Sequence, residues 1–226
     1  AIDNIAFGVN SREESVQRGV KWFPYNKGGQ YRKWYGNNEY VVFYKNDGQE
    51  LIDLVTKKYP KISDPEFIIK NRNCYFKKGI EWSDLSTSNY GARIVEGGFI
   101  FDACSPTLFI NSGCSYYYLL GFMNTSIFQN YMNILSPTLH YNICNVLQVP
   151  LIKAKIGEVE NLVGLNVELS RFDWNAYENS WEFKKHAFIQ PVNKIVDAYK
   201  NWEIECNDNF YRLKNNEERL NSIFVD

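Results

Sequence analysis

The sequence has few of the residues that build metal sites and disulfide frameworks. Two histidines, His140 and His186, occur in 226 residues, and the five cysteines lie far apart without a C-x-x-C pair. Neither histidine has a second ligand at the spacing of a zinc site, so each is interpreted as a surface or satisfied core residue. Scattered cysteines in odd number, with no signal peptide, are typical of reduced thiols in a cytoplasmic protein.

Long apolar runs and the glycine motifs of common enzymes are also missing. The apolar stretch near Tyr116–Met123 is too short to span a membrane, so no membrane partner is expected. The chain has no G-x-S-x-G turn and no phosphate-binding P-loop, which excludes the enzymes built on those motifs. With 45% hydrophobic and 23% charged residues, the composition is that of an ordinary globular protein.

Charge is present in both signs but is unevenly distributed. The net charge is −1, yet Lys21 to Arg93 carries thirteen Lys/Arg against eight Asp/Glu, and 94–226 carries ten against fifteen. A basic front half and an acidic back half fit a binding face supported by a scaffold, and they equally fit ordinary solvated charge. The charge pattern alone leaves both interpretations open.

The front of the chain predicts helices packed on a twisted mixed or antiparallel sheet, which is an α+β fold. Ser11 and Glu14 have capping-box spacing and predict a short helix that ends near Gly19. A strand is predicted over 39–44, a helix over 49–58, and a helix within 115–135. The other short apolar segments, interpreted as extended, are 67–69, 93–95, 99–101, 108–110 and pieces of 139–149.

The sequence also predicts a turn at Gly97-Gly98 and a domain boundary near Lys153. Gly97-Gly98 is placed in a hairpin between the segments 93–95 and 99–101. After Lys153 the pattern becomes helical, with a helix over 158–169, a possible N-cap at Ser170, and a long amphipathic helix or helix pair from Val192 onward. The sequence therefore predicts a sheet-containing domain over 1–153 and a helical brace or spacer over 154–226.

One segment, Lys27 to Val42, is long and distinctive: it is rich in glycine, aromatic and basic residues. It resembles a signature of PglX, the adenine-specific DNA methyltransferase of BREX phage-defence systems, downstream of the catalytic domain. Further segments that resemble this family follow in order: Phe76–Asp84, Gly98–Asp102, Glu168–Trp174, Ser180–His186 and Asn216–Phe224. A weaker similarity, over Tyr118–Thr125 and then Gln148–Pro150, is to the target-recognition domains of type I restriction specificity subunits.

The resemblance implies that this chain is the target-recognition region of an adenine-N6 methyltransferase and no complete enzyme. S-adenosylmethionine binding needs a glycine-rich strand-to-helix turn, and no G-x-G motif occurs. Adenine methylation needs an Asp/Asn-Pro-Pro-aromatic loop, whereas the nearest match, Asp64 to Phe67, has glutamate in place of the second proline. No cofactor is therefore expected here, and the catalytic domain of the same polypeptide is expected to be a partner.

The resemblance also implies that duplex DNA is the ligand, and the residue types support this. Amides pair with adenine edges, guanidinium groups with guanine, and cations and small hydroxyls with phosphates. The expected DNA-binding residues are Lys21, Lys27, Gln30, Arg32, Lys33, Asn37, Asn38, Lys77, Lys78, Ser86, Ser88 and Arg93. Trp34, Tyr35 and Trp82 are interpreted as packing residues before base-stacking ones, and Gly36 to Asn38 as a turn before the strand.

A second hypothesis is that the chain is a protein-interaction module. The near-neutral charge and the amphipathic C-terminal helix favour a module that docks the methyltransferase onto other defence-system proteins or an inhibitor. DNA binding predicts a steep salt dependence, whereas docking predicts dependence on the exposed apolar residues of the last helix. An RNA-binding module is disfavoured because no aromatic RNP-like pattern occurs.

Overall fold

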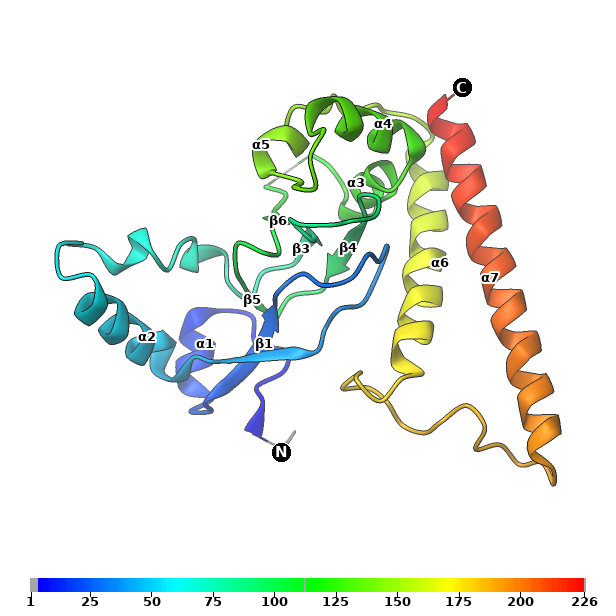
Figure 1. Cartoon of the computed structure of the whole chain (residues 1–226), viewed down its shortest axis with the longest axis horizontal. Coiled ribbons are helices and arrows are strands. Elements are labelled where there is room, and N and C mark those ends of the chain that lie inside the picture. Colours follow the sequence, from blue (N-terminus) through cyan, green and yellow to red (C-terminus); the bar gives the residue numbers. More distant parts are fainter. Residues whose placement is uncertain (1–3, 112, 226) are drawn as a thin grey trace.

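The predicted α+β class is confirmed by a computed structural model that describes residues 4–111 and 113–225 (Figure 1). The α-helices of the described part are α1 (Arg12–Gln17), α2 (Lys45–Lys58), α3 (Tyr116–Met123), α4 (Ser126–Leu135), α5 (Ile143–Val146), α6 (Ile156–Asn175) and α7 (Ile195–Val225). Short 3-10 turns cover Pro65–Phe67 and Arg72–Cys74. The strands are β1 (Trp22–Asn26), β2 (Tyr40–Phe43), β3 (Gly79–Trp82), β4 (Ala92–Val95), β5 (Ile100–Phe101) and β6 (Thr107–Leu108).

The strands form two small sheets. In the first, β1 lies between antiparallel β2 and parallel β5; in the second, β3 lies between antiparallel β4 and β6. The predicted hairpin at Gly97-Gly98 is therefore wrong, because β4 and β5 belong to different sheets. Both glycines have positive φ, 106° and 82°, which lets this connection turn from the second sheet to the first.

Local sequence signals placed several elements correctly. The Ser11 hydroxyl accepts a hydrogen bond from the Glu14 amide and caps α1 as predicted. The predicted strand over 39–44 is β2, and the predicted helix over 49–58 is α2. The long C-terminal helix is α7, a single helix, and the predicted helix over 158–169 is the middle of α6.

Other expectations are corrected. The segment 67–69 is not extended: Phe67 ends a 3-10 turn and is 72% exposed. The segment 139–149 contains the short helix α5, and Ser170 lies inside α6 and caps nothing. The single helix expected within 115–135 is two, because the Thr125 hydroxyl accepts from the Phe128 amide and starts α4 as a new helix.

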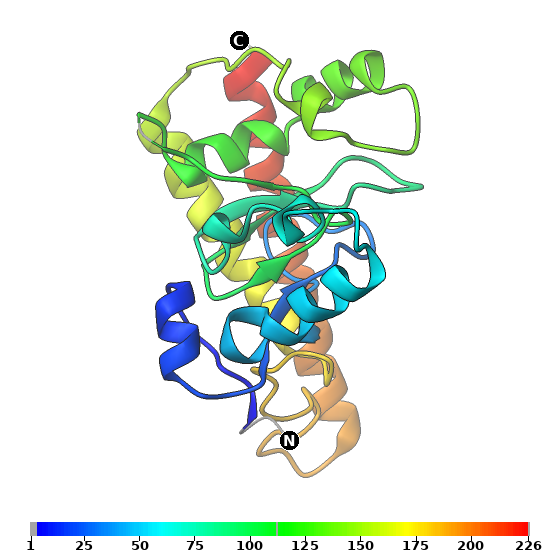
Figure 2. The same cartoon turned by 90° about the vertical axis from the view of Figure 1, so that its left-hand side faces the viewer.

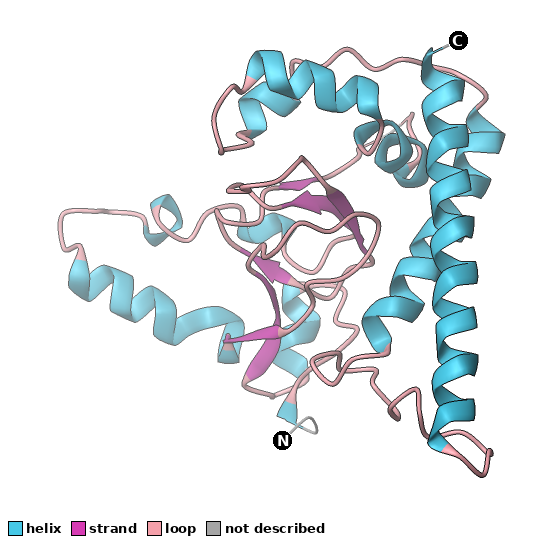
Figure 3. Ribbon diagram, turned by 45° about the vertical axis from the view of Figure 1, so that its right-hand side comes forward, coloured by secondary structure: helices cyan, strands magenta, loops and turns pink. Residues whose placement is uncertain are grey.

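The main hydrophobic core joins the two predicted domains. It contains the second sheet (Ile80, Ile94), helix α3 (Leu120, Phe122), and residues of α6 and α7. Helix α3 crosses α6 closely, since a Cβ atom at Gly121 would lie 2.7 Å from a Val163 methyl group. The domain division at 153 stays a prediction, but residues from both sides of it share this core. Figure 3 shows the two long C-terminal helices alongside the strands and the shorter helices.

Helices α6 and α7 run antiparallel along one side of the molecule and are joined by the loop 176–194 (Figure 1). A second, smaller core lies against the first sheet and includes Phe23, Tyr44, Phe76 and Ile100. Helix α2 and the turns that follow it extend away from this sheet on the opposite side from α6 and α7 (Figures 1 and 2). The strands thus lie between α2 with its following turns on one side and α6 with α7 on the other. We call α6 and α7 together the helical wall.

Candidate functional site

The loop after β1 is held in place by close packing at Gly28 and by side-chain hydrogen bonds to its backbone. Gly28 has a φ of 74°, and a Cβ atom there would lie 2.6 Å from the Cys104 carbonyl oxygen, so no larger residue fits without a shift. The Ser83 hydroxyl donates to the Gly29 carbonyl at 3.0 Å, and the Asn37 amide donates to the Gln30 carbonyl at 2.9 Å. These contacts leave the side chains of Lys27 and Gln30 exposed.

A second loop, 84–89, lies beside the first. The Ser86 hydroxyl donates to the Asn89 carbonyl at 3.3 Å and accepts from the Ser88 amide at 3.2 Å. The Tyr141 hydroxyl donates to the Ser88 carbonyl at 3.4 Å, which ties this loop to the segment before α5. Since Ser83 contacts Gly29 and Tyr141 contacts Ser88, three chain segments meet here.

The third segment contributes His140. Its Nδ1 lies 2.7 Å from an Asp84 carboxylate oxygen, and its side chain remains 55% exposed. The backbone of this segment pairs with the second loop, because the Tyr141 amide donates to the Asp84 carbonyl at 2.7 Å. His140 is thus a surface histidine satisfied by Asp84, and one of its ring nitrogens stays open to a ligand.

We call the convergence of these segments the loop face. Its polar side chains are Lys27, Gln30, Tyr31, Ser86, Ser88 and His140. Tyr31 is 42% exposed, and burial of the rest of its side chain raises its pKa above the ordinary value. Sequence reasoning missed Tyr31 and His140, because nothing in the chain signals that residues 31 and 140 share a surface.

Two residues expected at the DNA surface instead brace the loop against the helices. Arg32 forms an ion pair with Asp173, and its guanidinium lies 5.0 Å from the centre of the Trp174 ring. Lys33 pairs with Glu217 of α7 at 3.0 Å. The charges of Arg32 and Lys33 are thus matched by carboxylates of α6 and α7, and phosphate contact by either residue stays a prediction.

The same carboxylate of α7 also holds an aromatic residue. Glu217 accepts a hydrogen bond from the Trp34 indole at 2.7 Å, and Trp34 is 1% exposed. Trp82 is equally buried and donates to the Tyr141 carbonyl at 2.7 Å. Both tryptophans are therefore packing residues, as predicted, and neither is available to stack on a base.

Arg93 and Asn37 are also internal. Arg93 is 1% exposed, and its guanidinium bonds Glu81 at 3.1 Å across the β3–β4 ladder. Asn37 is buried and has a φ of 63°, which is left-handed geometry, but no turn is assigned over 36–38. Both side chains are enclosed and bonded within the protein, and base reading by either of them stays a prediction. Asn38 beside them is half-buried.

The remaining expected cations lie away from the loop face. Lys21 precedes β1 and Lys27 follows it, which separates them by roughly 20 Å at the usual rise of a strand. Lys77 and Lys78 precede β3, at the opposite end of that strand from Ser83. Lys78 pairs with Glu96 at 2.8 Å, whereas Lys21 and Lys77 are exposed. The structure therefore gathers four of the twelve predicted residues on the loop face (Lys27, Gln30, Ser86 and Ser88), and the other eight lie elsewhere.

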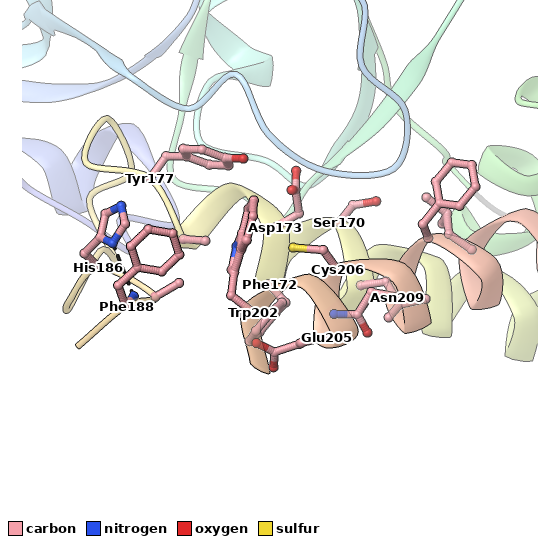
Figure 4. Close-up of a pocket in the computed structure, with 15 residues that line it drawn as sticks. Ser170, Phe172, Asp173, Tyr177, His186, Phe188, Trp202, Glu205, Cys206 and Asn209 are labelled. Carbon is pink, nitrogen blue, oxygen red and sulfur yellow. Dashed lines mark hydrogen bonds between the residues drawn. The ribbon is translucent and has the colours of Figure 1, made fainter. Parts of the chain in front are cut away.

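A cavity of about 520 Å³ lies between α6 and α7, beside the loop that joins them (Figure 4). It lies on the helical wall, whereas the loop face is built by segments from the strand region. Aromatic rings dominate its lining, and they come from α6, α7 and the connecting loop: Phe172, Tyr177, Phe188, Trp202 and Phe210. The sequence indicated an amphipathic helix here but no cavity.

The described part of the chain has no candidate metal site and no helix that could span a membrane. Residues 4–111 and 113–225 contain no grouping of three or more His, Cys, Asp or Glu side chains suited to a metal ion. The helices there are too short or too polar to pass through a bilayer. All five cysteines are free thiols.

Comparison with known proteins identifies the relatives of this chain. No protein-family model matches it. It is 35% identical over 222 residues to an adenine-specific methyltransferase PglX from Lacticaseibacillus casei (strain Zhang). It is 33% identical over 223 residues to an adenine-specific methyltransferase BrxX from Escherichia coli O9:H4 (strain HS).

Each match covers 96% of this chain but only 18% and 17% of the respective relative. The chain therefore spans less than a fifth of the length of the curated relatives that it matches. The similarity runs through the loop face, the core and the helical wall alike. The resemblance to PglX seen in the sequence is confirmed: the chain is similar to one segment of two adenine-specific methyltransferases, PglX and BrxX.

Proposed function

We propose that this chain recognises the target site in duplex DNA on behalf of an adenine-N6 methyltransferase that acts in phage defence. The observation that carries the proposal is the loop face. Three segments far apart in the sequence meet there, and hydrogen bonds fix their backbones. Their polar side chains offer one amide, hydroxyls, an imidazole and one cation. A fixed polar surface of this kind suits readout of base edges, which requires donors and acceptors at set positions.

The side chains of the loop face divide by chemistry. Gln30 offers both a donor and an acceptor, the pair that adenine presents in the major groove. Lys27 carries a positive charge that suits a phosphate, and its ammonium lies 5.5 Å from the centre of the Tyr40 ring. Ser88 adds a short hydroxyl that also suits a phosphate, whereas the Ser86 hydroxyl already donates to the Asn89 carbonyl. The chain thereby combines positioning contacts and base contacts on one surface.

Methyl transfer is assigned to the part of the protein outside this chain. The sequence has neither a cofactor-binding glycine turn nor the Asp/Asn-Pro-Pro-aromatic loop. The catalytic domain of the same polypeptide, which would bind S-adenosylmethionine, is therefore the proposed intramolecular partner. Methyl transfer to duplex DNA by the 226-residue chain alone would contradict this division of roles.

A salt titration tests the loop face. The triple variant Lys27→Ala/Gln30→Ala/Tyr31→Ala is expected to bind duplex DNA at least about 30-fold more weakly than the unaltered chain, because base contacts are each worth about 1–3 kcal/mol. The loss of Lys27 also lowers the slope of log affinity against log salt by about one. Fluorescence anisotropy across a salt series, with a duplex that the unaltered chain retains from a random pool, measures both quantities.

A matched variant controls for charge removed elsewhere. Lys21→Ala/Lys77→Ala deletes two exposed cations that lie at the far ends of β1 and β3. It is expected to retain affinity within about threefold, since neither cation reaches the loop face. Equal losses in the two variants would show that binding follows overall charge. Absence of binding by the unaltered chain at low salt would contradict the proposal itself.

Docking of another protein is the second candidate function, and a different surface favours it. The cavity between α6 and α7 is lined by partly exposed rings on the helical wall, with Phe172 52% exposed and Tyr177 57% exposed. The two functions are compatible because they use separate surfaces.

A further inference from the structure

The cavity between α6 and α7 has the chemistry of a site for a flat cation. Tyr177, Phe188 and Trp202 surround the hollow, and the Cys206 thiol points toward Trp202 (Figure 4). Phe188 and Trp202 meet edge to face, with ring centres 5.6 Å apart. Aromatic faces carry negative potential and attract ammonium and guanidinium groups.

Charge in the lining has one sign. Asp173 and Glu205 contribute carboxylates, while no lysine or arginine lines the cavity. Asp173 already receives Arg32, but Glu205 has no ion-pair partner among the described residues. Burial raises the pKa of the Cys206 thiol, and the negative charges of Glu205 and Asp173 raise it further. His186 is the other titratable group in the lining, and Lys184 and Lys185 precede it outside the cavity.

Two arginines packed at α6 show which group an aromatic ring beside a carboxylate binds in this protein. Arg32 stacks on Trp174 and pairs with Asp173. Arg171 lies 4.8 Å from the centre of the Tyr35 ring and pairs with Glu96 at 3.3 Å. In both places a guanidinium lies against an aromatic ring and meets a carboxylate, which is an arrangement that arginine satisfies better than lysine. The cavity offers the ring and the carboxylate without the arginine.

We propose that the cavity between α6 and α7 is a docking site for an arginine side chain on a protein segment whose flanking residues are apolar. The guanidinium stacks on Trp202 and pairs with Glu205, and the apolar neighbours cover the exposed rings of Phe172 and Tyr177. This assignment is independent of DNA binding, because none of these residues belongs to the loop face.

Cysteine protection measures occupancy directly. The probe is the peptide acetyl-Gly-Leu-Arg-Leu-Gly-amide, and its reference has neutral citrulline in place of arginine. Alkylation of Cys206 by iodoacetamide, followed by peptide mass spectrometry, is expected to slow with the arginine peptide in a saturable manner. Cys144 is also exposed but lies outside the cavity, so its alkylation rate should not change.

Variants connect the protection to the proposed contacts. Glu205→Gln and Trp202→Leu are each expected to lower the affinity for the arginine peptide by about fivefold. This is the usual contribution of an exposed ion pair or cation–π contact. Glu203→Gln removes a charge from the same helix outside the cavity and should leave protection unchanged. Equal protection by the citrulline peptide would overturn the proposal, because the cavity would then bind apolar groups without regard to charge. Absence of protection by either peptide would overturn it as well.

Discussion

Replacement of Glu81 by alanine is expected to lower the free energy of unfolding by about 3–5 kcal/mol, the usual result of leaving a buried charge without its partner. Glu81 and Arg93 lie opposite each other on β3 and β4, and each is 1% exposed. One carboxylate oxygen accepts from Arg93 at 3.1 Å, and the other accepts from the Ser105 hydroxyl at 2.6 Å. In Glu81→Ala the guanidinium stays enclosed while its counter-charge is gone.

Two further variants separate burial from charge. Glu81→Leu/Arg93→Met removes both charges and is expected to recover most of the lost stability, since an apolar pair needs no desolvation of ions. Glu96→Ala breaks ion pairs at the surface with Lys78 and Arg171, and a loss of about 1 kcal/mol or less is expected. Urea unfolding followed by circular dichroism measures all three. Similar losses for Glu81→Ala and Glu96→Ala would show that burial does not govern the effect.

Asp47→Asn is expected to cost about 2–3 kcal/mol, because the Asp47 carboxylate serves two arginines at once. It lies 2.6 Å from Arg72, a buried side chain, and 2.5 Å from Arg12 of α1. The Tyr44 hydroxyl donates to it at 2.9 Å. Asparagine preserves the side-chain size and tolerates the positive φ of 58° at this position, so the change isolates the charge.

The pH dependence of stability gives this prediction a second readout. Burial alone would raise the pKa of Asp47, but hydrogen bonds from Arg12 and Tyr44 and the charge of Arg72 lower it below the ordinary value. A lowered folded-state pKa means that the contribution is complete above the ordinary aspartate pKa, near 3.9, and is lost as pH falls through the folded value. Asp47→Asn should therefore lose less stability on acidification than the unaltered chain. An identical acid limb in both proteins would contradict this assignment.

Elements with a strong local signal could be predicted from the sequence. Ser11 and Glu14 fix the start of α1 because capping is a matter of a few adjacent residues. The apolar period of α7 is local in the same sense. The Gly97-Gly98 turn was also located correctly, but its partners were not. Strand pairing depends on segments far away: β5 pairs with β1, about 75 residues earlier in the chain.

The candidate site was likewise predictable only where local sequence decides. Residue type identifies cations and amides, yet their exposure depends on what packs over them. Arg32 pairs with Asp173, which is distant in sequence, and Arg93 pairs with Glu81, which is near. Neither ion pair could be inferred without the fold. His140 joined the loop face only because its segment pairs with 84–86. The sequence thus predicted the ligand class through its resemblance, and the fold selected the residues.

The claim that the loop face reads DNA sequence is tested most directly by selection from a random duplex pool. The 226-residue chain and the Gln30→Ala variant are each taken through rounds of binding, and the retained duplexes are sequenced. We expect the unaltered chain to enrich one short site. Gln30→Ala should relax the preference at one position of that site while phosphate-driven binding persists. Enrichment of the same site, unrelaxed, by the variant would contradict the assignment, as would retention of DNA by the unaltered chain without any enriched sequence.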